Sequence, residues 1–143
     1  MSTYPSHSAK NVYFGCIDDR LVQPHILFVD MIGGAFCPSL AGGALAFISP
    51  EQRDIALKQI IAAYSINHID HVYIESHTDC DAYGLAGVVF NDLEEEIQRL
   101  YKDLEFAKNE VVGALLRAGA QTTEFKVITR LIDPEGNPHP QSA

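Results

Sequence analysis

The sequence predicts a single α/β domain over residues 1–143, with a mostly parallel β-sheet flanked by helices. Strand-like segments alternate with helical segments along the chain, and a helix lies between two of the strands. The length of 143 residues fits one domain. Apolar residues make up 47% and charged residues 20%, which is typical of a chain that buries a core without disulfide bonds.

Four segments have the composition of β-strands. Residues 11–17 are rich in β-forming residues, and residues 26–29 form a continuous apolar run that is typical of a strand covered on both faces. Residues 71–75 predict a further strand, and residues 124–132 alternate like a final one. The strand, helix, strand order predicts parallel pairing with a right-handed crossover.

Two segments predict helices of different kinds. A helix is expected to begin after Ser49 and to run to about residue 65, because Pro50 occupies the first turn and Gln52 follows three residues after the serine. Its apolar face is expected to carry Ile55, Ile60, Ile61 and Tyr64. Residues 93–118 have apolar side chains at alternating spacings of four and three, which predict one long helix ending at Gly119. Such a stripe suits a partner interface or the helix's own sheet, and we expect the sheet.

Residues 31–50 form an uncharged segment that contains four glycines and two prolines. Because these residues break helices, we expect a buried, glycine-rich loop with a short helix rather than a membrane-spanning segment. Residues 133–137 have the composition of a turn.

Net charge and cysteine content indicate which binding partners and which cellular compartment to expect. The net charge of −9 disfavours binding to nucleic acid or to a membrane surface. The three cysteines are an odd number at irregular spacing, which argues against a secreted disulfide framework. The first ten residues do not resemble a signal peptide. We therefore expect a cytoplasmic protein whose thiols are available as metal ligands.

Potential metal ligands follow two of the predicted strands. Cys16-Ile-Asp18-Asp-Arg20 lies at the end of the first strand, and His77-Thr-Asp-Cys80 lies just past the strand at residues 71–75. Because the carboxyl ends of parallel strands meet at one edge of a sheet, the two motifs are expected to lie close together. Two thiols and an imidazole suit Zn²⁺, and three protein ligands leave a fourth coordination position open.

The two motifs resemble the zinc signature of the β-class carbonic anhydrases. The resemblance covers roughly residues 12–85, and residues 126–137 resemble the family more loosely. It implies a zinc lyase that hydrates carbon dioxide reversibly to bicarbonate by zinc-bound hydroxide, in a homodimer or a larger homo-oligomer. It also implies that Cys16, His77 and Cys80 bind Zn²⁺ and that Asp18 and Arg20 form the catalytic pair.

The sequence departs from the family pattern near the predicted site. Asp30 begins the stretch where the family usually has Arg-Asn-Ala-Gly, Ser76 replaces the glycine before the zinc histidine, and Asp81-Ala82 replaces a glycine pair. These changes keep the ligands but alter the pocket and its charge, to which Asp19 and Asp79 are also expected to contribute.

Three alternatives to carbon dioxide hydration stay open. The same site suits a hydrolase of carbonyl sulfide or carbon disulfide, and it equally suits a non-catalytic zinc protein in which Asp18 closes the fourth position. A thiol enzyme that uses Cys80 or Cys16 with His77 ranks lowest. The other cysteine and three histidines are not expected to belong to the site. Cys37 is expected to be a small buried residue, and surface or helix-end positions are expected for His25, His68 and His71.

Overall fold

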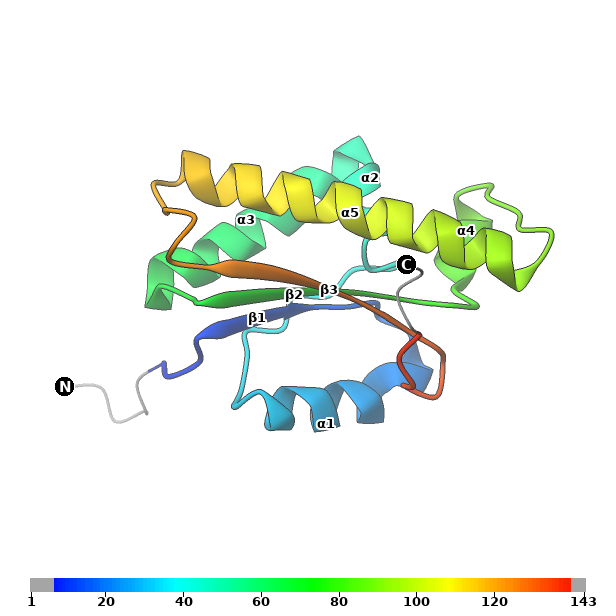
Figure 1. Ribbon diagram of the computed structural model, residues 1–143, viewed down its shortest axis with the longest axis horizontal. Coiled ribbons are helices and arrows are strands. Elements are labelled where there is room, and N and C mark those ends of the chain that lie inside the picture. The colour runs from blue at the N-terminus through cyan, green and yellow to red at the C-terminus, as the bar shows by residue number, and fades with distance from the viewer. Residues whose placement is uncertain (1–6, 140–143) are drawn as a thin grey trace.

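The computed structural model describes residues 7–139 and contains a parallel three-stranded sheet between two layers of helices (Figure 1). The strands β1 (Asn11–Phe14), β2 (His71–His77) and β3 (Lys126–Ile132) lie in chain order, and both neighbouring pairs are parallel. Helix α1 (Val22–Met31) covers one face, whereas α3 (Pro50–Asn67) and α5 (Leu93–Arg117) cover the other. The predicted α/β fold with a parallel sheet is confirmed.

The predicted strand at residues 26–29 is wrong, because these residues belong to α1. An apolar run of four residues fits a strand or a helix equally well. The position beside β1 is taken by a later segment, in which Phe36 and Ser39 form parallel bridges to Val12 and Gly15. Helix α1 packs with only part of its surface, so that Ile26 is 49% exposed and Leu27 is 61% exposed.

Helix α3 begins at Pro50, as predicted, and continues two residues further than expected. Ser49 is the N-cap, but its side chain makes no capping hydrogen bond. The buried face consists of Ala56, Ile60 and Ala63, whereas Ile55 is half exposed, so the predicted apolar face is only partly correct.

Helix α5 follows the prediction closely. Asp92 accepts a hydrogen bond from the backbone N–H of Glu95, and Gly119 follows the helix with a φ of +98°. The stripe packs against β2 and β3 of its own sheet, as expected. Its buried apolar residues are Leu100, Leu104, Ala107, Val111, Ala114 and Leu115.

The uncharged segment contains the short helix α2 (Leu45–Ile48), with Ala46 and Phe47 buried. Gly43, just before α2, lies against β2 with a φ of +57°. A Cβ atom at this position would overlap the carbonyl oxygen of Glu75, so only glycine allows this approach. Among residues 7–139, no helix is long and apolar enough to cross a membrane.

Candidate metal centre

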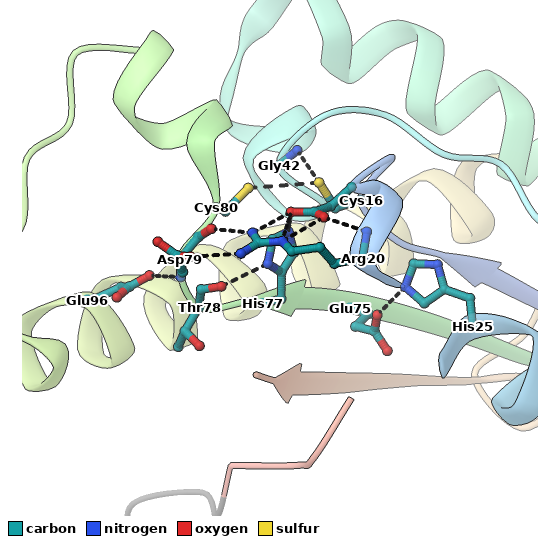
Figure 2. A network of polar contacts seen from close by, with 11 residues as sticks. Cys16, Arg20, His25, Gly42, Glu75, His77, Thr78, Asp79, Cys80 and Glu96 are labelled. Carbon is teal, nitrogen blue, oxygen red and sulfur yellow. Dashed lines mark hydrogen bonds and ion pairs between the residues drawn. The ribbon is translucent and has the colours of Figure 1, made fainter. Parts of the chain in front are cut away.

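The structure brings Cys16, His77 and Cys80 together at the carboxyl edge of the sheet (Figure 2). Cys16 follows β1, His77 is the last residue of β2, and Cys80 immediately precedes the short helix α4 (Asp81–Leu85). The ligand atoms all lie within 4.8 Å of one another, and at most 9% of each residue is exposed. The ends of β1 and β2, together with the start of α4, therefore create a compact cluster of two thiols and an imidazole.

The orientation of His77 leaves one ring nitrogen available. Its Nδ1 lies 2.8 Å from the carbonyl oxygen of Thr78. Because a carbonyl only accepts, Nδ1 carries the hydrogen and Nε2 keeps its lone pair. Nε2 is buried and has no hydrogen-bond partner among residues 7–139. A buried polar atom without a partner is costly, and a metal ion is the partner that suits a neutral imidazole nitrogen beside two sulfur atoms.

The two sulfur atoms fit the same interpretation. Cys16 Sγ and Cys80 Sγ are 3.8 Å apart, and both cysteines are free. Two sulfurs at 2.3 Å from a tetrahedral zinc ion would be separated by about 3.8 Å. The residues present therefore fit a metal ion with sulfur and nitrogen ligands.

The sulfur atoms of Cys16 and Cys80 are in hydrogen-bond contact with each other. Cys16 Sγ also accepts a hydrogen bond from Gly42 N–H at 3.1 Å, and the pairing with Cys80 together with this bond lowers the pKa of Cys16. The pKa of Cys80 is raised by the same pairing and by burial. The lowered pKa favours the thiolate form of Cys16, which is the form that binds a metal.

Asp18 and Arg20 form an ion pair next to the cluster. Arg20 Nη2 is 2.7 Å from Asp18 Oδ2 and Arg20 Nε is 3.0 Å from Asp18 Oδ1, so one edge of the guanidinium group binds the carboxylate in a bidentate manner. The hydrogen bonds from Arg20 lower the pKa of Asp18 to about 2. Asp18 Oδ2 lies 3.7 Å from His77 Nε2, which places an ionised carboxylate at the side of the cluster.

A second buried group lies between α1 and the sheet. Glu75 of β2 is 1% exposed, and its carboxylate accepts hydrogen bonds from the Tyr13 hydroxyl and from His25 Nε2, the latter at 2.6 Å. Arg130 of β3 lies 3.4 Å from the same carboxylate and stacks over the ring of Phe28. This arrangement gives a buried negative charge three partners on the face of the sheet that α1 covers.

Solved structures resemble this architecture over most of the chain. A tetrameric β-carbonic anhydrase of Sordaria macrospora has 16% sequence identity and a TM-score of 0.64, with 94% of this chain and 81% of that chain covered. The chain has the β-carbonic anhydrase fold. A β-carbonic anhydrase of Aspergillus fumigatus has 18% identity and a TM-score of 0.56, covering 92% and 74% of the two chains. A carbon disulfide hydrolase has 14% identity and a TM-score of 0.51, covering 96% and 81%. No protein-family model and no curated protein sequence matches the chain.

The partly buried pair of His25 and Glu75 was not found from the sequence. His25 was expected at a surface or helix end, but its side chain is 18% exposed and is paired with Glu75. The alternation of β2 places Glu75 and His77 on the same face of the sheet, but nothing in the sequence marks Glu75 as buried.

The remaining sequence expectations have mixed outcomes. Cys37 is exposed, so its expected burial is wrong, because the loop after α1 leaves this thiol at the surface. His68 caps the end of α3 and His71 begins β2, close to the expected positions. The acidic residues expected near the zinc are all exposed, and among them Asp79 has a specific partner in Arg20; they are Asp19, Asp30, Asp79 and Asp81.

Proposed function

We propose that this protein is a zinc-dependent carbonic anhydrase that interconverts carbon dioxide and bicarbonate. The observation that carries the proposal is the buried Nε2 of His77, which has no described partner and faces two cysteine sulfurs 3.8 Å apart. An ionised carboxylate, Asp18, is held beside them by Arg20. The β-carbonic anhydrase fold supports this assignment of the cluster.

In this proposal Cys16, His77 and Cys80 hold Zn²⁺ and leave one coordination position open. Bound zinc acts as a Lewis acid that lowers the pKa of water toward 7. Asp18 would accept a hydrogen bond from a water molecule beside these ligands and so orient it toward the substrate. Arg20 keeps Asp18 ionised and occupies part of its hydrogen-bonding capacity, which prevents the carboxylate from moving onto the metal.

A mostly apolar cavity adjoins the loop that contacts Cys16, although none of the three proposed ligands lines it. Its volume is about 430 Å³, and its walls include Leu45, Ile48 and Leu85. The cavity also contacts Ala41, which adjoins the Gly42 N–H that binds Cys16. Carbon dioxide suits such walls, and so do carbonyl sulfide and carbon disulfide. The structural likeness to a carbon disulfide hydrolase therefore makes hydrolysis of these molecules the second candidate function.

We also propose that the protein assembles as a homodimer or a larger homo-oligomer. No residue of α1 is buried, and its apolar side chains Val22, Ile26, Leu27 and Met31 are between 49% and 73% exposed. A second copy would cover this surface. A cytoplasmic location accords with the cluster, because Cys16 and Cys80 bind a metal only as thiolates and a disulfide between them would abolish the site.

Metal content and stopped-flow hydration of carbon dioxide test the function. The wild-type protein should contain about one zinc per chain and hydrate carbon dioxide. Cys80→Ser should lose zinc and activity, whereas Cys37→Ser, which changes the exposed thiol, should keep both. Arg20→Ala should keep zinc and lose at least about tenfold in kcat/KM.

The outcomes separate the candidates. A zinc-loaded protein that turns over carbon disulfide but not carbon dioxide would favour the second function. A zinc-loaded protein inactive on both substrates would favour a non-catalytic zinc protein, and undiminished zinc in Cys80→Ser would overturn the metal site.

A further inference from the structure

Arg20 is bound along both edges of its guanidinium group (Figure 2). One edge holds Asp18, and the other meets Asp79, with Nη1 2.8 Å from Asp79 Oδ2 and Nη2 2.8 Å from the Asp79 carbonyl oxygen. The Arg20 side chain is 40% exposed, and an isolated ion pair at such a position contributes little to orientation. The contact with Asp79 therefore adds a second restraint on the plane in which the guanidinium group binds Asp18.

Asp79 offers these two oxygens only in an unusual backbone conformation. Its φ is +57°, in the left-handed region that residues with a Cβ atom adopt rarely. The backbone N–H of Asp79 donates to Glu96 Oε1 at 2.5 Å. Glu96 belongs to the first part of α5, a long helix fixed against the sheet by its buried stripe. A rigid element thus holds the strained residue in place from outside the loop.

We propose that Glu96 is a positioning residue that keeps Arg20 on Asp18 and thereby keeps Asp18 away from the metal. The proposal rests on the proposed function, and Glu96 acts through Asp79 and Arg20 without touching the cluster. When the carboxylate of Glu96 is removed, Asp79 is free to leave its left-handed conformation, and the second edge of Arg20 loses both acceptors. Asp18, whose Oδ2 is already 3.7 Å from His77 Nε2, is then free to turn toward the ligands.

The orientation of Arg20 is measurable without metal or substrate. In ¹⁵N-labelled, metal-free protein, the hydrogen exchange rate of Arg20 Nε–H reports its bond to Asp18. Glu96→Ala should accelerate this exchange by about tenfold to about a hundredfold, as expected when a hydrogen-bonded charged pair is released. Arg99 is an internal reference, because its Nε lies 3.1 Å from both carboxylate oxygens of Asp103 on the same helix. Its exchange should not change.

Two variants at the start of α5 serve as controls. Glu94→Ala removes the same charge from the same helical turn. Glu94 accepts a 3.4 Å hydrogen bond from Gln98 on its own helix, so Arg20 exchange should stay at the wild-type rate. Glu96→Gln keeps an acceptor oxygen for Asp79 N–H and should restore the wild-type rate. If Glu96→Ala does not fold, Glu96→Asp keeps the charge but shortens the side chain, and it should accelerate Arg20 exchange in the same way.

Unchanged Arg20 exchange in the Glu96 variants would overturn the proposal, and so would equal acceleration at Arg20 and Arg99, which indicates loosening of the whole helix. Carbon dioxide hydration by the zinc-loaded wild-type protein tests the proposed function separately from the role of Glu96. An inactive wild-type protein with selective acceleration at Arg20 refutes the function and supports the role of Glu96. An active wild-type protein with unchanged exchange in Glu96→Ala refutes the role of Glu96 alone.

Discussion

Gly43→Ala should destabilise the protein far more than the same change at Gly33. Both glycines have positive φ angles, +57° at Gly43 and +86° at Gly33, so alanine is strained at either position. They differ in surroundings: a Cβ atom at Gly43 overlaps the Glu75 carbonyl oxygen and lies 3.3 Å from Ser76 Oγ, whereas a Cβ atom at Gly33 has nothing within 4 Å. The comparison isolates the cost of the close approach to β2.

The expected losses of stability follow from three contributions, of which the first is common to both glycines. The left-handed conformation costs alanine about 1–2 kcal/mol at both positions. At Gly43 the overlap adds about 1–3 kcal/mol, because the Glu75 carbonyl is part of a paired strand and cannot move freely. Displacing the loop also breaks the hydrogen bond from Ala44 N–H to Ser76 Oγ, worth about 1 kcal/mol. Gly43→Ala should therefore lose about 3–6 kcal/mol and Gly33→Ala about 1–2 kcal/mol.

Urea unfolding followed by circular dichroism, with a chelator present, measures both variants without the contribution of bound metal. Zinc affinity gives a second readout, because displacement of residues 41–44 removes the Gly42 N–H from Cys16 Sγ and should weaken binding in Gly43→Ala alone. Equal free energies of unfolding for the two variants would refute the reasoning from the close approach.

Three further predictions concern a buried charge, a pH dependence and an interface. Glu75→Ala should lower the free energy of unfolding by about 3–5 kcal/mol, because three side-chain partners lose a buried acceptor; a loss below about 1 kcal/mol in urea titration would contradict this. The depressed pKa of Asp18, about 2, stabilises the metal-free protein above pH 4, and this contribution is lost as pH falls from about 4 to about 2. Because Arg20 is partly exposed, the wild-type protein should be more stable than Asp18→Asn by at most about 1 kcal/mol at pH 5. Near pH 2 the two proteins should be equally stable. A difference in stability that stays constant from pH 5 to pH 2 would refute this role of Asp18. Leu27→Lys with Met31→Lys should shift sedimentation toward the monomer, whereas an unchanged assembly would exclude α1 from the interface.

The parts of the fold with a clear period could be predicted from the sequence. Apolar residues recur at helical spacing along α5, and β2 and β3 are apolar segments bounded by turn residues. The predicted type and chain order of these three elements were therefore correct. The proposed ligands could be found because they directly follow β1 and β2, and the carboxyl ends of parallel strands share one edge. Helix α1 could not be distinguished from a strand, because its short apolar run lacks a period and its packing depends on the segment that bridges to β1.

The contacts around Arg20 could not be predicted for a different physical reason. Asp18 and Arg20 are close in sequence, so their pairing is local, whereas Asp79 and Glu96 meet through a left-handed backbone conformation and a helix that begins far along the chain. In the sequence both residues look like acidic surface positions. The site is thus divided between two sources of order: the sheet places the proposed ligands, and α5 orients the ion pair beside them. Loss of the Glu96 carboxylate from α5 should therefore lower activity while the three proposed ligands still bind zinc, and loss of a ligand at the ends of β1 and β2 should abolish both zinc binding and activity.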